Sequence, residues 1–491
     1  MGSPPTTTLL SALRGLLAMR VLVALMALAA LVLAGCVTPG SLLSTSSVAP
    51  LKLDLLAATD SLWPDHQNEP HPSYGWPTLT HPATGAEVPA LWKPIPAANV
   101  TKIAGLKHVA QSTKDVKTGA GVALFGSLAV LPGFSKENYV IDISEPTVPK
   151  VLGKWEGSER GAAVMAFPDG RLYGVISTDA GIDVVNLTDP THPEIVSQIK
   201  PKTGGHKVGV VPGTPIVYNA NSAGGGTTSF TGQGGAGQTE IYDLTDPAAP
   251  VLVQEFKNGF GCHHIFFWND ASQDKHRALC AGIEYTQIWD IKDPKAPKVI
   301  VSIPVPHGNP ALPSMSAPNA LPLMFSHTAF LNQNGNILIV GDELMGGGPA
   351  ACDGVHTPVA DKSGPLGNLW FYDIKDEKNP KLLGWFSPPP SQATDPRAPN
   401  ADPTNPSGTV FRTPGCTAHH GRIVSDPEGK KQLLVMAWYS AGVVLVDFTD
   451  PTSPKLVDEW NPGANTWETW YYNGYVFTGD LNRGLDVLTF K

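Results

Sequence analysis

The chain has 491 residues, and its 50 glycines, 47 prolines and only 16% charged residues favour an all-β protein with many tight turns over a helical one. A formal net charge of −9, without a run rich in Lys and Arg, argues against a nucleic-acid partner. The length would ordinarily suggest about three domains, but internal repeats take precedence over that expectation.

The N-terminal residues have the pattern of a secretory targeting segment. Two arginines precede an apolar stretch from Val21 to Val32, and Leu33-Ala34-Gly35-Cys36 resembles the lipobox of bacterial lipoproteins. The resemblance implies acylation of Cys36, which would tether the protein to a membrane without spanning it. The apolar run is short for a membrane span; an uncleaved anchor is the alternative. We therefore expect a signal peptide over 1–35 and an exported protein, lipid-anchored to the bacterial cell membrane or outer membrane and facing the periplasm or the exterior.

Residues 36–98 contain Trp, Pro and His with little periodicity, so we expect a tether and an irregular arm there. Beyond the arm, a phrase of alternating β-branched and aromatic residues recurs, followed by an acidic residue and two prolines. Copies that are complete or nearly so begin at Val140, Val184, Ile241, Ile288, Phe371 and Leu445, and a truncated copy begins at Gly484.

The phrase has a direct structural meaning. Its alternation predicts a strand, its Asp-Pro step predicts a turn, and its later proline predicts an outermost strand, since proline lacks an N–H. Two further strands precede each phrase, which gives four strands per unit. The sequence therefore predicts an all-β, seven-bladed β-propeller over residues 99–491.

The last copy ends at its third strand, so blade seven needs a strand from elsewhere. Residues 99–106 have the composition of such a strand and stand directly before blade one. We expect them to pair with Leu485–Phe490 and close the ring, which would remove two exposed strand edges.

The recurring D-[IL]-x-D-P-x-x-P phrase resembles the LVIVD repeat family, and the resemblance covers nearly all of the chain beyond the arm. It implies a cell-surface propeller without a settled activity. Through Tyr372-Asp373-Ile374 the chain also resembles, more weakly, the selenium-binding protein and methanethiol oxidase family, which implies histidines that hold copper. Glu377 departs from that pattern, because it stands where a proline is expected.

The starts of the innermost strands align to give one position per blade. These positions are His108, Arg160, His206, His263, His327, His419 and Trp467. Inner strands line the channel of a propeller, so we expect these side chains to converge there. Neighbours along a strand point to opposite sides, so we expect His263 and His419 to face the channel rather than His264 and His420.

Converging histidines with carboxylates suit a transition metal, namely Cu, Zn or Fe. The expected ligands are His206, His263, His327 and His419. The alternative is a polar plug, in which His and Trp fill a wet channel through waters and carbonyl groups.

Long insertions at 222–238, 306–325, 344–367 and 388–415 fall on the loops of the face where the inner strands begin. Functional residues gather on loops held by a rigid scaffold, so this face should carry the function. Acidic residues end several second strands on the same face. The residues expected to bind a ligand are Arg160, Glu284, Asp342, Glu343, Trp467 and Asp480.

Apart from Cys36, the chain has four cysteines, and an even number in an exported protein predicts disulfides. Cys262 and Cys280 stand nearly opposite each other across one hairpin, and Cys352 and Cys416 stand on two long loops. We expect the pairs Cys262–Cys280 and Cys352–Cys416.

Two functions follow from these observations. The first is a cell-surface binding or scaffolding module that takes a small molecule or a surface protein on its histidine-lined face. The second is a metal-dependent, copper-type oxidoreductase with its histidine site at the channel. A Ca²⁺-dependent, lactonase-like propeller would need carboxylates and Asn where this ring has His. The sequence assigns no catalytic residue.

Overall fold

The computed structural model describes much of the chain from residue 90 onward. The described residues are 90–112, 116, 118–134, 136–157, 159–167, 170–178, 181–202, 204–220, 238–259, 261–270, 274–282, 285–304, 324–344, 367–386, 388, 417–439 and 441–491. All of them belong to one compact unit, Leu53–Lys491. The expected signal peptide, Cys36 and most of the arm lie outside these ranges. Within them, no helix is both long and apolar enough to cross a membrane.

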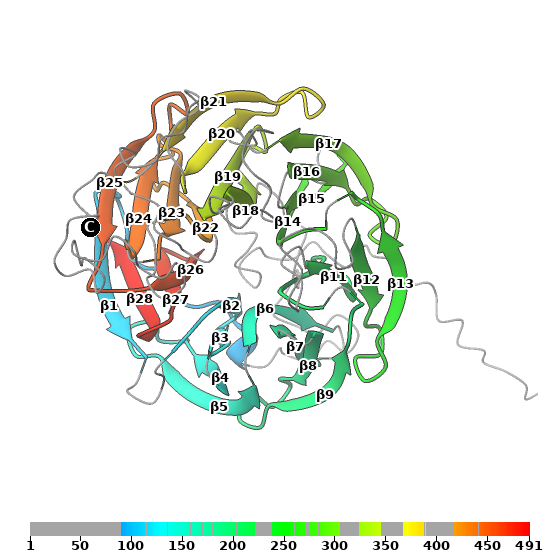
Figure 1. The fold of residues 1–491 in the computed structure, drawn as a ribbon. Coiled ribbons are helices and arrows are strands. Elements are labelled where there is room, and N and C mark those ends of the chain that lie inside the picture. Colours follow the sequence, from blue (N-terminus) through cyan, green and yellow to red (C-terminus); the bar gives the residue numbers. More distant parts are fainter. Residues whose placement is uncertain are drawn as a thin grey trace, which may run out of the picture. The chain divides into compact units, whose positions relative to one another are not determined.

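The strands of the described ranges form seven four-stranded antiparallel sheets around a central axis (Figure 1). A 3-10 helix, η3 (Ala90–Trp92), precedes them. Blades 1 to 3 consist of β2 (Ala123–Phe125), β3 (Leu128–Leu131), β4 (Lys136–Asp142) and β5 (Lys150–Gly157); β6 (Glu159–Ala166), β7 (Leu172–Thr178), β8 (Gly181–Asn186) and β9 (Glu194–Ile199); and β10 (Lys207–Val210), β11 (Ile216–Ala220), β12 (Thr239–Asp243) and β13 (Val251–Phe256). Blades 4 and 5 consist of β14 (His264–Asp270), β15 (Lys275–Ala281), β16 (Tyr285–Asp290) and β17 (Lys298–Pro304); and β18 (Met324–Leu331), β19 (Ile337–Leu344), β20 (Leu369–Asp373) and β21 (Lys381–Phe386). Blades 6 and 7 consist of β22 (Gly421–Val424), β23 (Leu433–Ala437), β24 (Val443–Asp447) and β25 (Lys455–Trp460); and β26 (Thr466–Tyr472), β27 (Tyr475–Asp480), β28 (Gly484–Phe490) and β1 (Leu106–Gln111). The predicted seven-bladed propeller is confirmed.

The repeated phrase forms the third strand of a blade and the turn that follows it. In blade 3, Asp243 ends β12 and its Oδ1 accepts a hydrogen bond from Thr245 N at 2.8 Å. The second acid, Asp246, accepts one from Ala248 N at 3.0 Å. Pro250 then leads into β13, which is the last strand of its sheet order. The prediction that this proline opens an outermost strand is correct, because an edge strand tolerates a missing N–H.

Blade 7 is completed by a strand from the N-terminal side, but its position differs from the prediction. β1 pairs antiparallel with β28 from Leu106↔Phe490 to Gln111↔Asp486. The expected strand, 99–106, shares only its last residue with β1. Leu106 N donates a hydrogen bond to Asp458 Oδ2 at 2.8 Å, and Ala104 and Gly105 exchange backbone hydrogen bonds with Lys491, so the pairing extends two residues before β1.

His108 was assigned to the wrong strand. It belongs to β1, the outermost strand of blade 7, whereas β2 is the innermost strand of blade 1. Its Nε2 lies 2.8 Å from Asp486 Oδ1, and its ring stacks on Trp460 with centroids 5.1 Å apart. The alignment by sequence began one strand too early, because the closing strand resembles the first strand of a blade.

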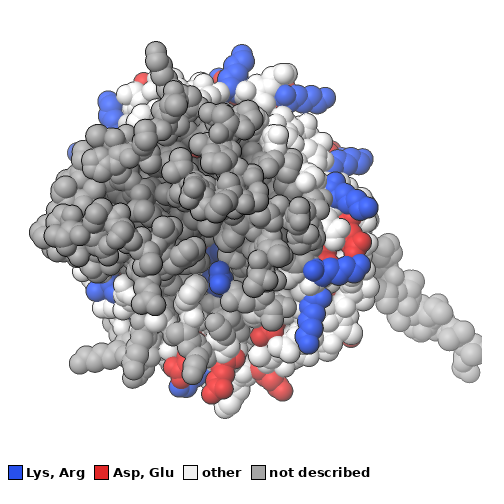
Figure 2. All heavy atoms as spheres, in the orientation of Figure 1, with Lys and Arg blue, Asp and Glu red and all other residues white. Residues whose placement is uncertain are grey.

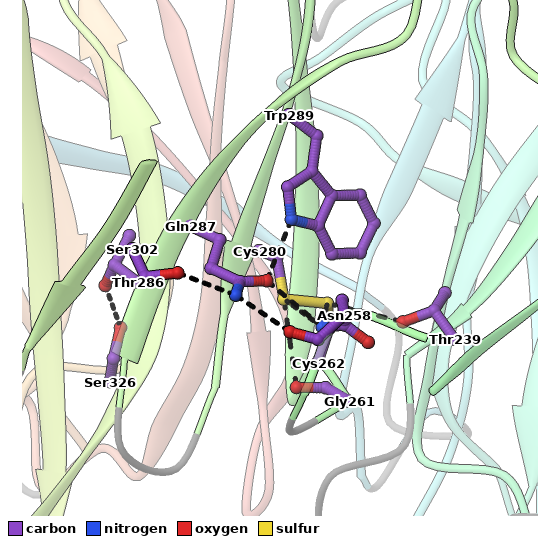
Figure 3. The surroundings of a disulfide bond; sticks show 10 residues. All are labelled: Thr239, Asn258, Gly261, Cys262, Cys280, Thr286, Gln287, Trp289, Ser302 and Ser326. Carbon is purple, nitrogen blue, oxygen red and sulfur yellow. Dashed lines mark hydrogen bonds between the residues drawn. A yellow bond between two sulfur atoms is a disulfide. The ribbon is translucent and has the colours of Figure 1, made fainter. Parts of the chain in front are cut away.

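The predicted bond between Cys262 and Cys280 is present, with the Cα atoms 5.3 Å apart. It joins the residue before His263 to β15. Asn258 Nδ2 lies 3.9 Å and 3.7 Å from the two sulfur atoms and 3.2 Å from Gln287 Oε1 (Figure 3). The loop that leads into the inner strand of blade 4 is therefore fixed from both sides. Cys352 and Cys416 lie outside the described residues.

Candidate metal centre

Four predicted histidines lie in a row at one end of the inner strands. His206 directly precedes β10, His263 precedes β14, His327 lies in β18, and His419 stands before β22. Successive rings have centroids 4.2 Å, 4.4 Å and 4.0 Å apart. The Nε2 atoms of His206 and His263 are 3.0 Å apart, so one of them donates a hydrogen bond to the other. The structure therefore brings imidazoles from four blades together.

His264 and His420 belong to the same cluster, and the expectation that they point away from it is wrong. Their rings are 4.4 Å apart, and the ring of His420 lies 4.6 Å from His327 and 4.2 Å from His419. Alternation along a strand sends neighbouring side chains to opposite faces of a sheet. His263 N bonds to Ala281 O although His264 is the register partner of Ala281, and Ala437 bonds to both His419 and His420. Two residues opposing one is a β-bulge, which interrupts the alternation, so both members of each pair reach the cluster.

One carboxylate joins these histidines. Glu343, near the end of β19, has its Oε2 3.3 Å from His327 Nε2, and its Oε1 accepts a hydrogen bond from the Tyr439 hydroxyl. Two overlapping groups result, His327 with His419 and His420, and His327 with His263 and Glu343. Within each group the candidate ligand atoms all lie within 4.8 Å of one another, and every residue is buried.

The hydrogen bonds fix which nitrogens carry protons. His419 Nδ1 bonds to Trp467 O, and His327 Nδ1 lies 3.2 Å from His419 O. A nitrogen that faces a carbonyl oxygen must be the N–H donor, so Nε2 of both rings presents a lone pair. Among the described residues, His419 Nε2 and both ring nitrogens of His420 have no hydrogen-bond partner. Lone pairs are therefore concentrated in a buried space.

Burial keeps these rings neutral. It is the largest cause that lowers the pKa of His263 to about 3, with Lys207 and Arg160 adding repulsion. Burial likewise lowers the pKa of His206, His264, His327, His419 and His420 well below the usual value. A neutral imidazole is the form that binds metals, so the cluster does not have to lose protons before it can bind an ion.

The spacing fits a transition metal. Imidazole nitrogens bind Zn²⁺ at about 2.0–2.1 Å, so two ligands on opposite sides of an ion are at most about 4.2 Å apart. Candidate atoms within 4.8 Å of one another need only small side-chain movements to reach that geometry. Three imidazoles, or two imidazoles and a carboxylate, are donor sets suited to Zn, Cu and Fe.

The other residues predicted for this face have different surroundings. Trp467 packs on His419 with ring centroids 4.4 Å apart, and the Arg160 guanidinium lies over the Phe134 ring at 5.3 Å. Asp342 is buried against the Trp370 indole N–H, and burial raises the pKa of its carboxyl to about 8. Within the described residues, Asp342 and Asp480 belong to neither of the two groups of candidate metal ligands.

Asp480 holds its own loop in place. It accepts hydrogen bonds from Asn465 N at 2.8 Å and Asn482 N at 2.9 Å. Glu284 lies outside the described residues, as do nearly all residues of the long insertions. Strand ends that flank two of these insertions pair with the beginnings of inner strands, as in Ala220↔Lys207 and Leu344↔Met324.

Tyr439 was not predicted. It follows β23 with a φ of +42°, and its ring centroid lies 4.7 Å from that of His419. Burial first, and then Glu343, raise the pKa of its hydroxyl well above the usual value, so it stays a hydrogen-bond donor. An alignment of the ends of second strands would have found it, because Tyr439 occupies in blade 6 the place that Glu343 occupies in blade 5.

No protein-family model matches the chain, and no curated protein matches it. Among solved structures, it is similar to Saccharomyces cerevisiae Sqt1, with 10% identity, a TM-score of 0.43, and coverage of 77% of this chain and 82% of that one. It is also similar to the β-propeller domain of Myceliophteria thermophila Cps50 (Swd1), with 10% identity, a TM-score of 0.45, and coverage of 79% of this chain and 99% of that one. Both TM-scores are below 0.5, and the assignment as an all-β, seven-bladed propeller rests on the strand order of the described residues.

Proposed function

We propose that this protein is a metal-binding propeller whose buried histidine cluster holds a transition metal ion, Cu, Zn or Fe, at one mouth of the channel. One observation carries the proposal. His419 and His420 have buried ring nitrogens without a hydrogen-bond partner among the described residues, and these two histidines form a group with His327 whose ligand atoms lie within 4.8 Å of one another. A buried polar atom without a hydrogen bond costs about 1–3 kcal/mol. A metal ion removes that cost for several nitrogens at once, and Glu343 would supply a compensating negative charge.

The wider setting of the proposal comes from the sequence. The protein is exported, anchored through lipid on Cys36, and built from LVIVD-type repeats. Its histidine-lined face binds a small molecule or a surface protein, and the ion forms part of that binding surface. In this view the propeller is a rigid scaffold that presents the ion between its long loops.

The test is metal content together with thermal stability. Protein purified without chelators should contain close to one equivalent of Cu, Zn or Fe by mass spectrometry. Its melting temperature should fall after chelation and rise when the metal is restored, because a ligand that binds only the folded state stabilises it. His419→Ala should abolish both effects.

His192→Ala is the matched control. His192 bonds to Asp189 on an exposed turn with ring Nδ1 3.0 Å from Asp189 Oδ2, and its side chain is 84% exposed. This substitution should leave metal content and melting temperature unchanged. If the purified protein contains no metal and its melting temperature does not change when Cu, Zn or Fe is added, the polar plug is the correct interpretation. The histidines then fill the channel, and His327 and His419 donate hydrogen bonds to backbone carbonyl groups without binding an ion.

The second candidate function is a copper-type oxidoreductase, and Tyr439 is the observation that favours it. A phenol beside the histidines, hydrogen-bonded to a carboxylate that can take its proton, suits a centre that exchanges electrons. Copper-loaded protein should then show a Cu(II) electron paramagnetic resonance signal that ascorbate removes and air restores. A signal that ascorbate leaves unchanged would eliminate this candidate.

A further inference from the structure

A second polar site lies in the channel beside the histidine cluster. The cavity there is lined by the inner strands of six blades. Its charged lining residues are Lys207 on β10, Arg422 on β22 and Glu468 on β26. His264 lines the same cavity, so the two sites share a wall. The proposed metal centre makes no use of the three charged residues.

Among the described residues that line this cavity, two cations face one anion. Glu468 Oε2 lies 3.3 Å from Lys207 Nζ, and Glu468 Oε1 lies 3.6 Å from Arg422 Nη2. The Lys207 side chain is 4% exposed and the other two are 6% exposed. The same carboxylate also receives the Trp470 indole N–H at 3.2 Å and Val122 N at 3.4 Å. Two buried cations therefore share one anion that already serves two further donors.

A surplus buried charge is costly, by several kcal/mol for each ion that lacks compensation. Burial is the largest cause that lowers the pKa of Lys207, and Arg422 and Arg160 add repulsion against the pull of Glu468. On the face drawn in Figure 2, by contrast, charged side chains of both signs stand around the rim in contact with solvent. Among the described residues, the channel instead buries two cations against one carboxylate.

The backbone around the charges leaves room for them. A Cβ on Gly161 would lie 2.7 Å from Lys207 Cδ, and one on Gly121 would lie 3.1 Å from Glu468 Oε2. Apolar residues, Leu124, Val208 and Phe266 among them, also line the cavity. A ligand that fits both parts has a negative head and an apolar body.

We propose that this cavity binds a small organic carboxylate, with its head between Lys207 and Arg422 and its apolar body along Leu124, Val208 and Phe266. Charge-assisted hydrogen bonds from a buried ammonium and guanidinium would hold the carboxylate oxygens. The inference goes beyond the proposed metal centre and does not require it. Because His264 belongs to both sites, the carboxylate lies next to the histidine cluster.

Calorimetric titration at constant ionic strength tests the ligand class. The probes are butyrate, butyramide as its neutral counterpart, and inorganic phosphate. Each is titrated into the protein as purified and into protein treated with phenanthroline, a chelator that brings no carboxylate of its own. Butyrate should bind in both preparations and more tightly than either other probe. Equal binding of butyramide, or phosphate binding at least as tight as butyrate, would overturn the proposal.

Substitutions test the charge argument. Lys207→Met should weaken butyrate binding roughly ten- to hundredfold, the range expected for one charge-assisted hydrogen bond. Glu468→Gln should strengthen butyrate binding, because the Glu468 carboxylate then no longer competes with the butyrate carboxylate for Lys207 and Arg422. A purely structural role for the three charges predicts no such opposite effects, so weakening by both variants would refute the site. If Lys207→Met does not fold, Glu468→Gln still decides the question.

The control is Lys154→Met, which removes a cation from an exposed pair, Lys154 Nζ to Glu137 Oε1 at 2.6 Å, with the lysine side chain 60% exposed. It should leave butyrate affinity unchanged. A protein that binds butyrate but no metal would overturn the metal centre alone, and a protein that binds metal but no butyrate would overturn this inference alone.

Discussion

Replacing Glu343 with Gln should stabilise the metal-free protein and weaken its metal site. His327 Nδ1 carries its hydrogen toward His419 O at 3.2 Å, so its Nε2 lone pair faces the Glu343 carboxylate at 3.3 Å. With the imidazole neutral and the carboxyl ionised, this contact places two acceptor atoms opposite each other. Protonation of His327 would relieve this, but burial lowers the pKa of that ring well below its usual value. A metal ion relieves it directly.

The glutamine side chain changes this balance in a calculable way. Its amide N–H can donate to His327 Nε2, while its carbonyl oxygen can still accept from the Tyr439 hydroxyl. One added hydrogen bond should raise the unfolding free energy of the metal-free protein by about 1 kcal/mol. Loss of the carboxylate, which orients or binds the ion, should lower metal affinity about 10–100-fold, or roughly 1.4–2.7 kcal/mol.

Two assays measure the two effects. Denaturant unfolding in phenanthroline at neutral pH reports the stability of the metal-free protein, and competition with a coloured chelator reports metal affinity. Glu137→Gln is the matched control. Like Glu343, Glu137 accepts a hydrogen bond from a tyrosine hydroxyl, that of Tyr139 at 2.9 Å, but it lies on β4 of blade 1 and not among the cluster histidines. This substitution should leave metal affinity unchanged. A Glu343→Gln protein that is less stable without metal and binds metal normally would refute both the tautomer assignment and the role of the carboxylate.

Three further outcomes are expected. Replacing Cys262 and Cys280 together with Ser should lower the unfolding free energy by about 3 kcal/mol, the loop-closure value for a separation of 18 residues, and an unchanged denaturation midpoint would contradict this. A chain that starts at residue 112 should lose the β1 partner of β28 and aggregate through the exposed edge, whereas one that starts at residue 90 should show no aggregation by size-exclusion chromatography. In metal-free protein, the cluster histidines have folded pKa values below the unfolded value of 6.5, about 3 for His263, so the unfolded chain takes up protons first as the pH falls. The unfolding free energy should therefore be constant above about pH 6.5 and fall below it by up to about 1.4 kcal/mol per pH unit for each histidine. Denaturant titrations in which the unfolding free energy does not fall between neutral pH and about pH 5 would contradict this prediction.

The sequence predicts the blades well because their signals are local. Asp243 and Asp246 cap the backbone two residues ahead of each, and Pro250 marks the outermost strand, so a few adjacent residues specify half of a blade. The closing strand lacks such a signal. Its place depends on partners that are distant in the chain, Asp458 and Lys491.

The candidate site was predictable only as far as strand starts could be aligned. His206, His263, His327 and His419 were found in this way, and His108 was misplaced by one strand. His264 and His420 were set aside because strict alternation does not hold at a β-bulge, and the sequence gives no sign of the bulge at these strand starts. The contact between Lys207 and Glu468 spans 261 residues and exists only once the ring is closed, so no local pattern in the sequence announces it.

The closure of blade 7 also sets an order of events during folding. A hydrogen bond between His108 and Asp486 joins residues 378 positions apart, and no shorter loop can bring β1 beside β28. Contacts of such large sequence separation form slowly, since the chain between them must first be organised. β1 leaves the ribosome before any blade and β28 after all of the others. The edge of β1 therefore has to be kept from pairing with other chains until synthesis is nearly over, which makes this strand the natural point for a chaperone to protect.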